Sequence, residues 1–331
     1  MNRILDVRGL RVDIASENVS VHAVRGLDLE VSRGETLCVV GESGSGKSVT
    51  ALSILNLLPR QANLTAERMT FGDIDLLSLS KQRFAALRGS QIGMIFQDPM
   101  TSLNPAYTIG NQMMEVHQRH RRAGKAAARA RAIELLERVG ISNAQARLAQ
   151  YPHQLSGGLR QRVMIAMALM CEPALIIADE PTSALDVTIQ VQILKLLKTL
   201  QTDLGIAVIL ITHDLGVVAR VADRVAVMYA GQIVETGPTN VVFGTPRHPY
   251  TAGLLRSIPV PGKGDRYTRL QAIPGTVPNL TSHIHGCAFA SRCERRQADC
   301  TQNAVPLEGD SHAYRCFHPL QAIKEARHAV G

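Results

Sequence analysis

The sequence LCVVGESGSGKS, residues 37–48, joins a short apolar run to a glycine-rich loop and the start of a helical pattern. The run Leu37–Val40 has the composition of a buried strand, and Lys47–Leu58 has helical periodicity. A strand, a glycine-rich loop and a helix in this order predict the phosphate-binding loop of an α/β protein. The loop residues are Gly41, Glu42, Ser43, Gly44, Ser45, Gly46, Lys47 and Ser48.

Each residue type in this loop suits a phosphate ligand. Glycines allow successive backbone N–H groups to turn inward around the phosphates, and the helix start adds the positive end of its dipole. Lys47 is placed to reach the outer phosphates, and the Ser48 hydroxyl is placed to bind Mg²⁺. The loop therefore predicts binding of a nucleoside triphosphate together with magnesium.

A second apolar run, Leu175–Ala178, ends in the acidic pair Asp179 and Glu180. Ligand sites of open α/β sheets collect at the carboxyl ends of the strands, so both carboxylates are expected beside the phosphate loop. Asp179 would hold Mg²⁺ through water, and Glu180 would orient the attacking water. The alternative, a strand that ends in a solvated acidic turn, would be preferred only if the phosphate loop were absent.

Strand-like and helix-like segments alternate from about residue 35 to residue 236, which predicts a largely parallel sheet with helices on both faces. The helix-rich segment 100–155 is interpreted as an inserted helical subdomain. Proline and glycine become frequent after residue 237, and a domain boundary is expected at 245–260. The predicted strands are Leu37–Val40, Ile92–Phe96, Leu175–Ala178, Val208–Thr212 and Arg224–Tyr229, and the predicted helices are Lys47–Leu58, Ala126–Val139, Leu159–Cys171 and Ile189–Leu204.

The composition indicates a folded protein, with 45% hydrophobic and 19% charged residues in a chain of 331. Lys and Arg exceed Asp and Glu by 36 − 28 = 8, which suits nucleic acid, anionic lipid or a polyanionic ligand without choosing among them. The basic stretch His117–Arg131 is interpreted as a solvated, alanine-rich helix face. The chain has no recognisable signal peptide and no run of about 18 apolar residues, so it is expected not to cross a membrane itself.

The six cysteines fall into two groups. Cys38 and Cys171 lie in apolar surroundings and are expected to be small buried hydrophobic residues. The other four cluster inside a stretch of 30 residues in a proline-rich extension, and such clustering favours a metal over disulfides. Zinc and an iron–sulfur cluster both accept four cysteines, although the close C-x2-C pairs usual for structural zinc are absent. The four are Cys287, Cys293, Cys300 and Cys316, with His283, His285, His312 and His318 as alternative ligands.

The segment Leu155–Gln161, LSGGLRQ, resembles the signature motif of the ATP-binding-cassette (ABC) family. Other elements of that family follow in order along the chain. Gln97 matches the Q-loop, Ser183–Asp186 matches the D-loop, and His213 matches the switch histidine. Together with the phosphate loop and the acidic pair, these motifs extend the resemblance over roughly the first 250 residues.

The resemblance implies an ABC-type α/β fold with a RecA-like core, an antiparallel β subdomain and a helical subdomain. The cassette is expected at residues 1–255, with its helical subdomain at about 100–165. A small cysteine-rich extension is expected at residues 256–331.

The resemblance also implies a role for each motif. The catalytic residues would be Glu180, His213 and Gln97. The Mg²⁺ ligands would be Ser48, Gln97 and Asp179. ATP contacts would extend from the phosphate loop to Val49. Contacts to ATP on a partner cassette would come from Ser156, Gly157, Gly158 and Asp186. Because the signature also presents a helix start to an anion, the chain is expected to act as one half of a pair.

Four further segments resemble the dipeptide, oligopeptide and nickel permease branch of the family: Asp98–Pro105, Arg247–Leu255, Ile273–Gly275 and the cysteine pattern Gly286–Cys300. In such proteins the C-terminal extension can carry a [4Fe–4S] cluster. The resemblance therefore implies a cluster on Cys287, Cys293, Cys300 and Cys316, with zinc as the alternative. Four free thiols are the remaining interpretation.

The function implied is that of the ATP-binding and ATP-hydrolysing subunit of a bacterial importer of dipeptides or oligopeptides. Its expected partners are a second ABC ATPase (a heterodimer is favoured), two transmembrane permease subunits and an extracytoplasmic substrate-binding protein, but no nucleic acid. The chain would lie peripherally on the cytoplasmic face of the inner membrane. The alternatives are an importer of nickel or another small solute, an exporter subunit, and a soluble ABC protein of translation or DNA repair.

Two positions depart from the family pattern. Leu159 stands where glutamine is commonest in the signature. No Phe, Tyr or Trp precedes Phe71, although the family normally stacks adenine on an aromatic residue upstream of the phosphate loop. His22 or Val19 is the expected substitute, and weak adenine contacts with tolerance of other nucleotides are the resulting hypothesis.

Overall fold

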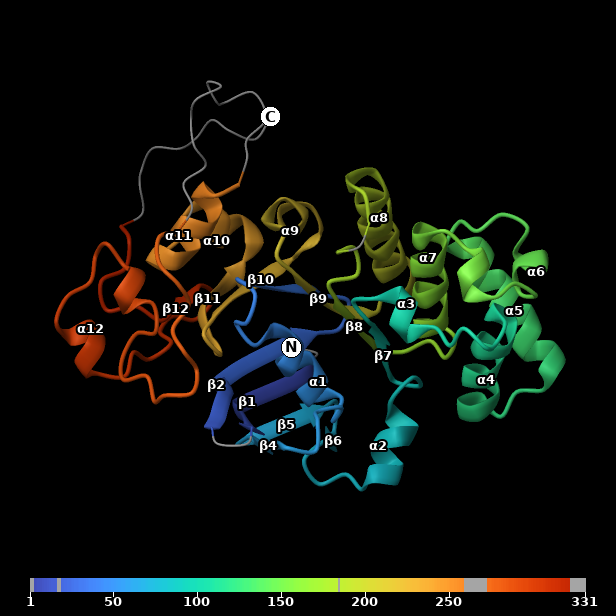
Figure 1. Ribbon diagram of the computed structural model, residues 1–331, viewed down its shortest axis with the longest axis horizontal. Coiled ribbons are helices and arrows are strands. Elements are labelled where there is room, and N and C mark those ends of the chain that lie inside the picture. Colours follow the sequence, from blue (N-terminus) through green and yellow to red (C-terminus); the bar gives the residue numbers. More distant parts are fainter. Residues whose placement is uncertain (1–2, 17–18, 184, 259–272, 322–331) are drawn as a thin grey trace.

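The structure, a computed structural model, describes residues 3–16, 19–183, 185–258 and 273–321. Figure 1 shows two stacked sheets in the middle of the molecule, a group of helices at one end and a C-terminal segment with little regular structure at the other. Ala184 of the D-loop and the stretches 259–272 and 322–331 of the expected extension lie outside the described residues.

Among the residues that the structure describes, the larger sheet has seven strands in the order β12-β11-β10-β3-β9-β8-β7. Strands β10, β3, β9, β8 and β7 pair in parallel, and every residue of β3, β8 and β9 is buried. Continuous burial is typical of parallel strands covered on both faces, and it explains the unbroken apolar runs in the sequence. The strands are β3 (Thr36–Val40), β7 (Ile92–Ile95), β8 (Leu175–Asp179), β9 (Ala207–Thr212), β10 (Arg224–Tyr229), β11 (Gln232–Pro238) and β12 (Ala313–Tyr314).

These strands confirm the five predicted ones, each end lying within one residue of its expected place. The first predicted helix is shorter than expected, because α1 spans Lys47–Ile54 and does not reach Leu58. Asn56 adopts a left-handed backbone with φ 50°, which ends the helix before the proline at position 59. Cys38 and Cys171 are buried, as expected.

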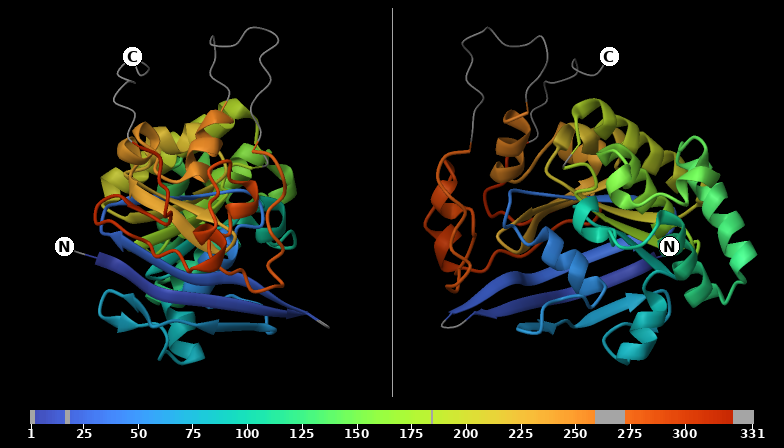
Figure 2. Two further views of the ribbon diagram at one scale, coloured as in Figure 1. Left: turned by 90° about the vertical axis from the view of Figure 1, so that its left-hand side faces the viewer. Right: turned by 45° about the vertical axis from the view of Figure 1, so that its right-hand side comes forward.

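The smaller sheet is antiparallel and packs against one face of the larger one (Figure 2). Its order is β2-β1-β5-β6, with β4 also paired to β1. Buried side chains such as Val7, Leu27 and Val39 form one apolar cluster between the two sheets. This sheet confirms the antiparallel subdomain. Its strands are β1 (Arg3–Ser16), β2 (Val19–Ser32), β4 (Ala62–Thr65), β5 (Arg68–Phe71) and β6 (Ile74–Asp75).

The helical subdomain is inserted between β7 and β8, as predicted. The basic stretch His117–Arg131 lies in this subdomain, but it is split between two helices, α4 and α5. It therefore does not form one continuous helix face. Arg122 has φ 52°, and Gly124 begins the next helix as its N-cap. The subdomain contains α3 (Pro99–Ser102), α4 (Ile109–Arg121), α5 (Lys125–Arg138), α6 (Ala144–Arg147), the short 3-10 helix η1 (Pro152–Gln154) and α7 (Gly157–Ala168).

The remaining helices surround the sheets or belong to the C-terminal part. Strand β12, from the C-terminal part, pairs with β11 at the edge of the larger sheet. No helix among the described residues is long and apolar enough to cross a membrane. The helices are α2 (Lys81–Leu87), α8 (Val187–Leu204), α9 (Leu215–Val221), α10 (Thr239–Gly244), α11 (Pro249–Arg256), the 3-10 helix η2 (Ala290–Arg292) and α12 (Asp299–Gln302).

Candidate active site

The phosphate loop connects the buried strand β3 to helix α1. Gly46 illustrates why the loop requires glycine: its φ is 98°, and a Cβ added there would lie 2.4 Å from the carbonyl oxygen of Ala23. Neither the backbone conformation nor the space accepts a side chain. The loop therefore lies with its backbone directly against the antiparallel sheet, in the conformation that a ring of inward N–H groups needs.

Lys47 is held inside this loop and is 5% exposed. Its Nζ donates to the carbonyl oxygens of Gly41 (2.8 Å) and Glu42 (2.9 Å). Burial lowers the pKa of Lys47, and the nearby carboxylates of Glu180, then Asp179 and Glu42, oppose that shift. The ammonium is thus poised among acceptors that phosphate oxygens can replace.

Asp179 is the last residue of β8 and lies next to the start of α1. The Ser48 hydroxyl donates to Asp179 Oδ1 at 3.0 Å. Burial raises the pKa of Asp179, and repulsion from Glu180 adds to this, while the Ser48 hydrogen bond lowers it. A hydroxyl and a carboxylate in contact at the phosphate loop are oxygen donors of the kind that Mg²⁺ binds, so these residues fit the ion.

Glu180 lies where three neighbouring parallel strands end. Gln97 Nε2, beyond the end of β7, donates to Glu180 Oε2 at 3.2 Å, and His213 Nδ1, just after β9, lies 3.4 Å from Glu180 Oε1. Glu180 itself has φ 43°, a left-handed backbone that is uncommon for a side chain of this kind. The sheet order β9-β8-β7 brings the three predicted catalytic residues together at one edge.

The signature residues form the start of α7. Ser156 is the N-cap, and its Oγ accepts a hydrogen bond from the backbone N–H of Leu159 at 3.4 Å. Ser156 and Gly157 are exposed. Asp186 plays the same N-cap role for α8, accepting from Ile189 N at 3.0 Å. Figure 1 places α7 with the other subdomain helices, to one side of α1 and its phosphate loop.

Two residues far along the chain contact the phosphate loop: Tyr250, in α11 at the end of the expected cassette, and Arg292, in the cysteine-rich extension. Neither was predicted from the sequence to belong to the nucleotide site. Arg292 donates to the carboxylate of Glu42, and the Tyr250 hydroxyl accepts from Glu42 N at 2.9 Å. These contacts join positions more than 200 residues apart in the chain. No local pattern of residue types signals them.

The four C-terminal cysteines line one small cavity. Burial raises the pKa of Cys316 to about 11, with the other three cysteines adding to the shift. Burial also raises the pKa of Cys287 and of Cys293. A bound cation would stabilise the thiolate forms that burial disfavours, so four cysteines around one cavity are a donor set that suits a metal centre.

Three of the four histidines considered as alternative metal ligands contact a histidine ring or a carboxylate. His283 stacks on His22 with ring centroids 4.8 Å apart. His312 Nε2 lies 2.7 Å from Glu235 Oε1. His318 remains close to the cysteines, because its Nε2 lies 2.9 Å from Asp299 and both residues gather around Cys300.

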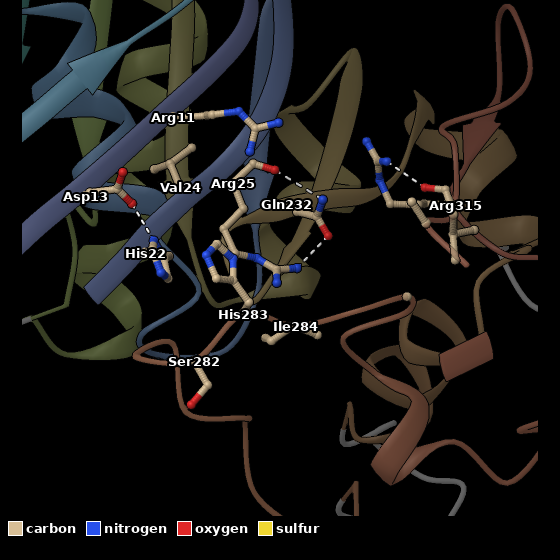
Figure 3. A pocket seen from close by; sticks show the side chains of 13 residues that line it. Arg11, Asp13, His22, Val24, Arg25, Gln232, Ser282, His283, Ile284 and Arg315 are labelled. Atoms are coloured by element: carbon tan, nitrogen blue, oxygen red, sulfur yellow. Dashed lines mark hydrogen bonds and ion pairs between the residues drawn. The ribbon is translucent and has the colours of Figure 1, made fainter. Parts of the chain in front are cut away.

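A cavity of about 400 Å³ lies between the β1–β2 hairpin and the C-terminal part (Figure 3). His22 lines it, bound through Nδ1 to Asp13 Oδ1 at 2.6 Å and covered by His283. Arg25 and Arg315 also line it. Burial lowers the pKa of Arg25, and repulsion from Arg315 lowers it further, whereas Cys287 opposes the shift. Val19, the other candidate for adenine stacking, is 47% exposed.

The phosphate loop at the end of a central parallel strand, the Ser48–Asp179 pair and the cluster around Glu180 define a P-loop nucleoside triphosphatase. Comparison with known protein families agrees. The ABC transporter family matches residues 24–183, and the family "Oligopeptide/dipeptide transporter, C-terminal region" matches residues 234–300.

The chain is 49% identical over 333 residues to the dipeptide transport ATP-binding protein DppD of Bacillus subtilis (strain 168), covering 100% of this chain and 98% of the relative. It is 53% identical over 294 residues to the oligopeptide transport ATP-binding protein OppD of the same organism, covering 88% and 82%. A solved dimeric structure of the ATP-binding cassette MJ0796 with ADP and Pi superposes with a TM-score of 0.64 at 27% identity, covering 71% of this chain and 98% of that chain. The chain therefore belongs to the ATPases of the ABC transporter family, in its oligopeptide/dipeptide branch.

Proposed function

We propose that the chain is the ATP-hydrolysing subunit of a bacterial ABC importer that takes up dipeptides or oligopeptides. The observation that carries the proposal is the convergence of Gln97, Glu180 and His213 beside the Ser48–Asp179 pair. The relatives, named for dipeptide and oligopeptide transport, support the peptide substrate. An importer of nickel or another small solute remains the alternative within the same branch.

Hydrolysis in this site is a matter of positioning and charge. Mg²⁺, when bound, neutralises charge on the phosphates, and Ser48, Asp179 and Gln97 would hold it. Lys47 exchanges its two carbonyl acceptors for phosphate oxygens. Glu180 orients the attacking water, with Gln97 and His213 fixing its carboxylate. The glycine-rich loop and Val49 bind the ATP.

The second half of the active site is proposed to come from another cassette. Ser156 and Gly157, both exposed, and the half-buried Gly158 form a helix start that suits the phosphates of ATP held by a partner, and Asp186 accompanies them. The dimeric MJ0796 cassette supports pairing of this kind. We favour a heterodimer of two ABC ATPases on two permease subunits, fed by an extracytoplasmic binding protein and without nucleic acid. The chain would lie on the cytoplasmic face of the inner membrane.

We further propose a division into a cassette at residues 1–255, with a helical subdomain at about 100–165, and an extension at residues 256–331. The match of a separate transporter family to residues 234–300 supports a distinct C-terminal region. The small cavity shared by four cysteines supports a metal centre within it.

A [4Fe–4S] cluster is the proposed occupant of the cysteine cavity, with zinc as the alternative. Both occupants accept four cysteine thiolates, and the four cysteines share one cavity. The guanidinium groups of Arg25 and Arg315, whose charges interact with Cys287, would offset the negative charge of a thiolate-bound cluster.

Purification of the tagged full-length chain from solubilised membranes tests the transport function. Recovery of two permeases and a second ATPase, with ATPase activity stimulated by peptide after reconstitution, supports the importer. Recovery of ribosomes or DNA in place of permeases would overturn it. Stimulation by a nickel chelate but not by peptides would favour the alternative substrate. Anaerobic purification with iron, sulfide and zinc analysis tests the cluster, and stoichiometric zinc without iron would exclude it.

A further inference from the structure

Arg292 lies in the C-terminal part, one residue before Cys293, yet it is buried against the phosphate loop. Its side chain is 4% exposed. A guanidinium has five N–H groups, and here all five have acceptors. The five hydrogen bonds go to Glu42 Oε2 (2.6 Å), Glu42 Oε1 (3.0 Å), Tyr229 OH (3.3 Å), Ile273 O (3.1 Å) and Pro274 O (2.9 Å).

Glu42, the partner of Arg292 in the phosphate loop, is also held by several hydrogen bonds. Its carboxylate is held in two-pronged fashion by Arg292, its backbone N–H donates to the buried Tyr250 hydroxyl at 2.9 Å, and its carbonyl oxygen accepts from Lys47. Tyr250 packs on Tyr229, with ring centroids 4.6 Å apart. The second residue of the phosphate loop is therefore fixed from behind by the C-terminal part of the chain.

Two physical consequences follow for a polyphosphate ligand. A glycine-rich loop has many accessible conformations, so contacts that fix it in advance reduce the entropy lost on binding. Glu42 also places a negative charge in the loop that binds phosphates. The hydrogen bonds with Glu42 raise the pKa of Arg292, and by the same pairing Arg292 offsets the charge of Glu42.

We propose that Arg292 is a positioning residue for ATP binding, which acts through Glu42 by fixing the phosphate loop and by neutralising its carboxylate. The inference rests on the proposed ATPase function. Because Arg292 directly precedes Cys293, the same contact makes ATP affinity depend on the order of the cysteine segment. The C-terminal part then contributes to the nucleotide site through the contact of Arg292 with Glu42.

The test compares the full-length wild type with Arg292→Gln, Glu42→Gln, the double variant, and Arg296→Gln. Arg296 is exposed in the same segment, so its variant removes the same charge without touching the loop. Binding of MgATP, the KM and kcat of ATP hydrolysis, and metal content are measured for each protein. For Arg292→Gln we expect an increase of about tenfold in Kd and KM, with kcat changed less than about twofold.

The double variant provides the decisive comparison. If Arg292 acts by fixing and neutralising Glu42, then Glu42→Gln added to Arg292→Gln restores at least about threefold of the lost affinity, because the unpaired carboxylate is gone. A purely structural role for Arg292 predicts no such recovery. Where Arg292→Gln does not fold, Arg292→Lys, which keeps the charge but loses the two-pronged contact, replaces it, with a smaller expected loss.

The outcomes separate the inference from the function beneath it. Unchanged ATP affinity in folded Arg292→Gln, or an equal loss in Arg296→Gln, overturns the role of Arg292 and leaves the ATPase function standing. Failure of the wild type to bind MgATP, or to hydrolyse it when paired with its partner ATPase, overturns the proposed function and the inference with it. Reduced affinity at unchanged metal content, with recovery in the double variant, establishes the contact as a determinant of ATP binding.

Discussion

The phosphate loop and the cysteine segment both hold charged groups in buried surroundings, but they do so by different means. The loop lies between a fully buried strand and a helix, and its groups are positioned by regular structure. The segment 273–321 contains only short elements, and arginine side chains bind its backbone: Arg292 holds Pro274 and Arg315 holds Val305. Regular secondary structure positions the groups of the phosphate loop, whereas hydrogen bonds from single arginine side chains help to fix the backbone of the cysteine segment.

This difference predicts where each region is sensitive. Hydrolysis should depend on a few groups at the ends of parallel strands, and should tolerate changes elsewhere on the surface. The cysteine segment should depend on its metal ligands and on its arginines, because it has few regular elements to hold its backbone. The variants below test that contrast.

The largest effect is expected at the strand ends. Glu180→Gln removes the carboxylate that orients water while keeping the size of the side chain. We expect kcat to fall by about a thousandfold, with MgATP affinity retained, because the phosphate loop is untouched. Size-exclusion chromatography of the variant mixed with its partner ATPase and MgATP should then show an accumulated dimer, since the closed state is no longer released by hydrolysis.

Glu137→Gln is the matched control for this variant, because Glu137 is exposed on α5 of the helical subdomain. Its kcat should equal that of the wild type. Retained turnover in Glu180→Gln would remove Glu180 from the catalytic role, and equal losses in both variants would indicate a general effect of charge.

A smaller effect is expected at the signature. Ser156→Ala removes a hydroxyl that would bind phosphate on the partner cassette. We expect turnover to fall about 10- to 100-fold, as for the loss of a hydrogen bond to a charged group, while ATP affinity of the separate subunit stays unchanged. The binding measurement is made below the concentration at which cassettes pair. A loss of affinity in the separate subunit would place Ser156 in its own ATP site.

The contrast between the regions also explains what the sequence could predict. The strands at Leu175–Asp179 and Ala207–Thr212 are continuous apolar runs, so their positions followed from composition. Parallel pairing of those strands then placed Glu180 and His213 at one edge without any knowledge of tertiary contacts. Local pattern and topology were sufficient for this site.

The contacts between the C-terminal part and the phosphate loop could not be predicted from local pattern and topology. Glu42 and Arg292 are 250 residues apart, and neither belongs to a periodic pattern that points to the other. The break at Arg122 was missed although the sequence carries a local signal for it: Gly124, the N-cap of α5, interrupts the alanine-rich stretch. Long-range contacts, by contrast, are not encoded in local composition.

Removal of one cysteine tests whether the cysteine segment influences the phosphate loop, and it is expected to have a smaller effect on the affinity for ATP. Cys293→Ala removes a proposed metal ligand next to Arg292, so we expect the metal to be lost and the Kd for MgATP to rise by about threefold as the segment loosens. Cys171→Ala is the matched control, since Cys171 is a buried thiol of the cassette that is 1% exposed. It should keep the metal and the affinity.

Metal analysis and ATP binding are measured on the same anaerobic preparations of both cysteine variants. Full metal content in Cys293→Ala would exclude this residue as a ligand. Loss of metal with unchanged Kd would show that the cysteine segment stays ordered around Arg292 without its centre, and the two regions would then be independent.

The smallest effect is expected for the base of the nucleotide. No aromatic residue precedes Phe71, the ring of His22 is stacked on His283 and bound to Asp13, and Val19 presents only a small apolar surface. Binding should therefore come mainly from the phosphates, and we expect the Kd values for MgATP and MgGTP to agree within about threefold. Val19→Tyr, which supplies an aromatic ring at the hairpin, should increase the preference for ATP if that position faces the base. A strong preference of the wild type for ATP would contradict this expectation. It would mean that a specific adenine contact contributes to the affinity in addition to the phosphate contacts of the loop.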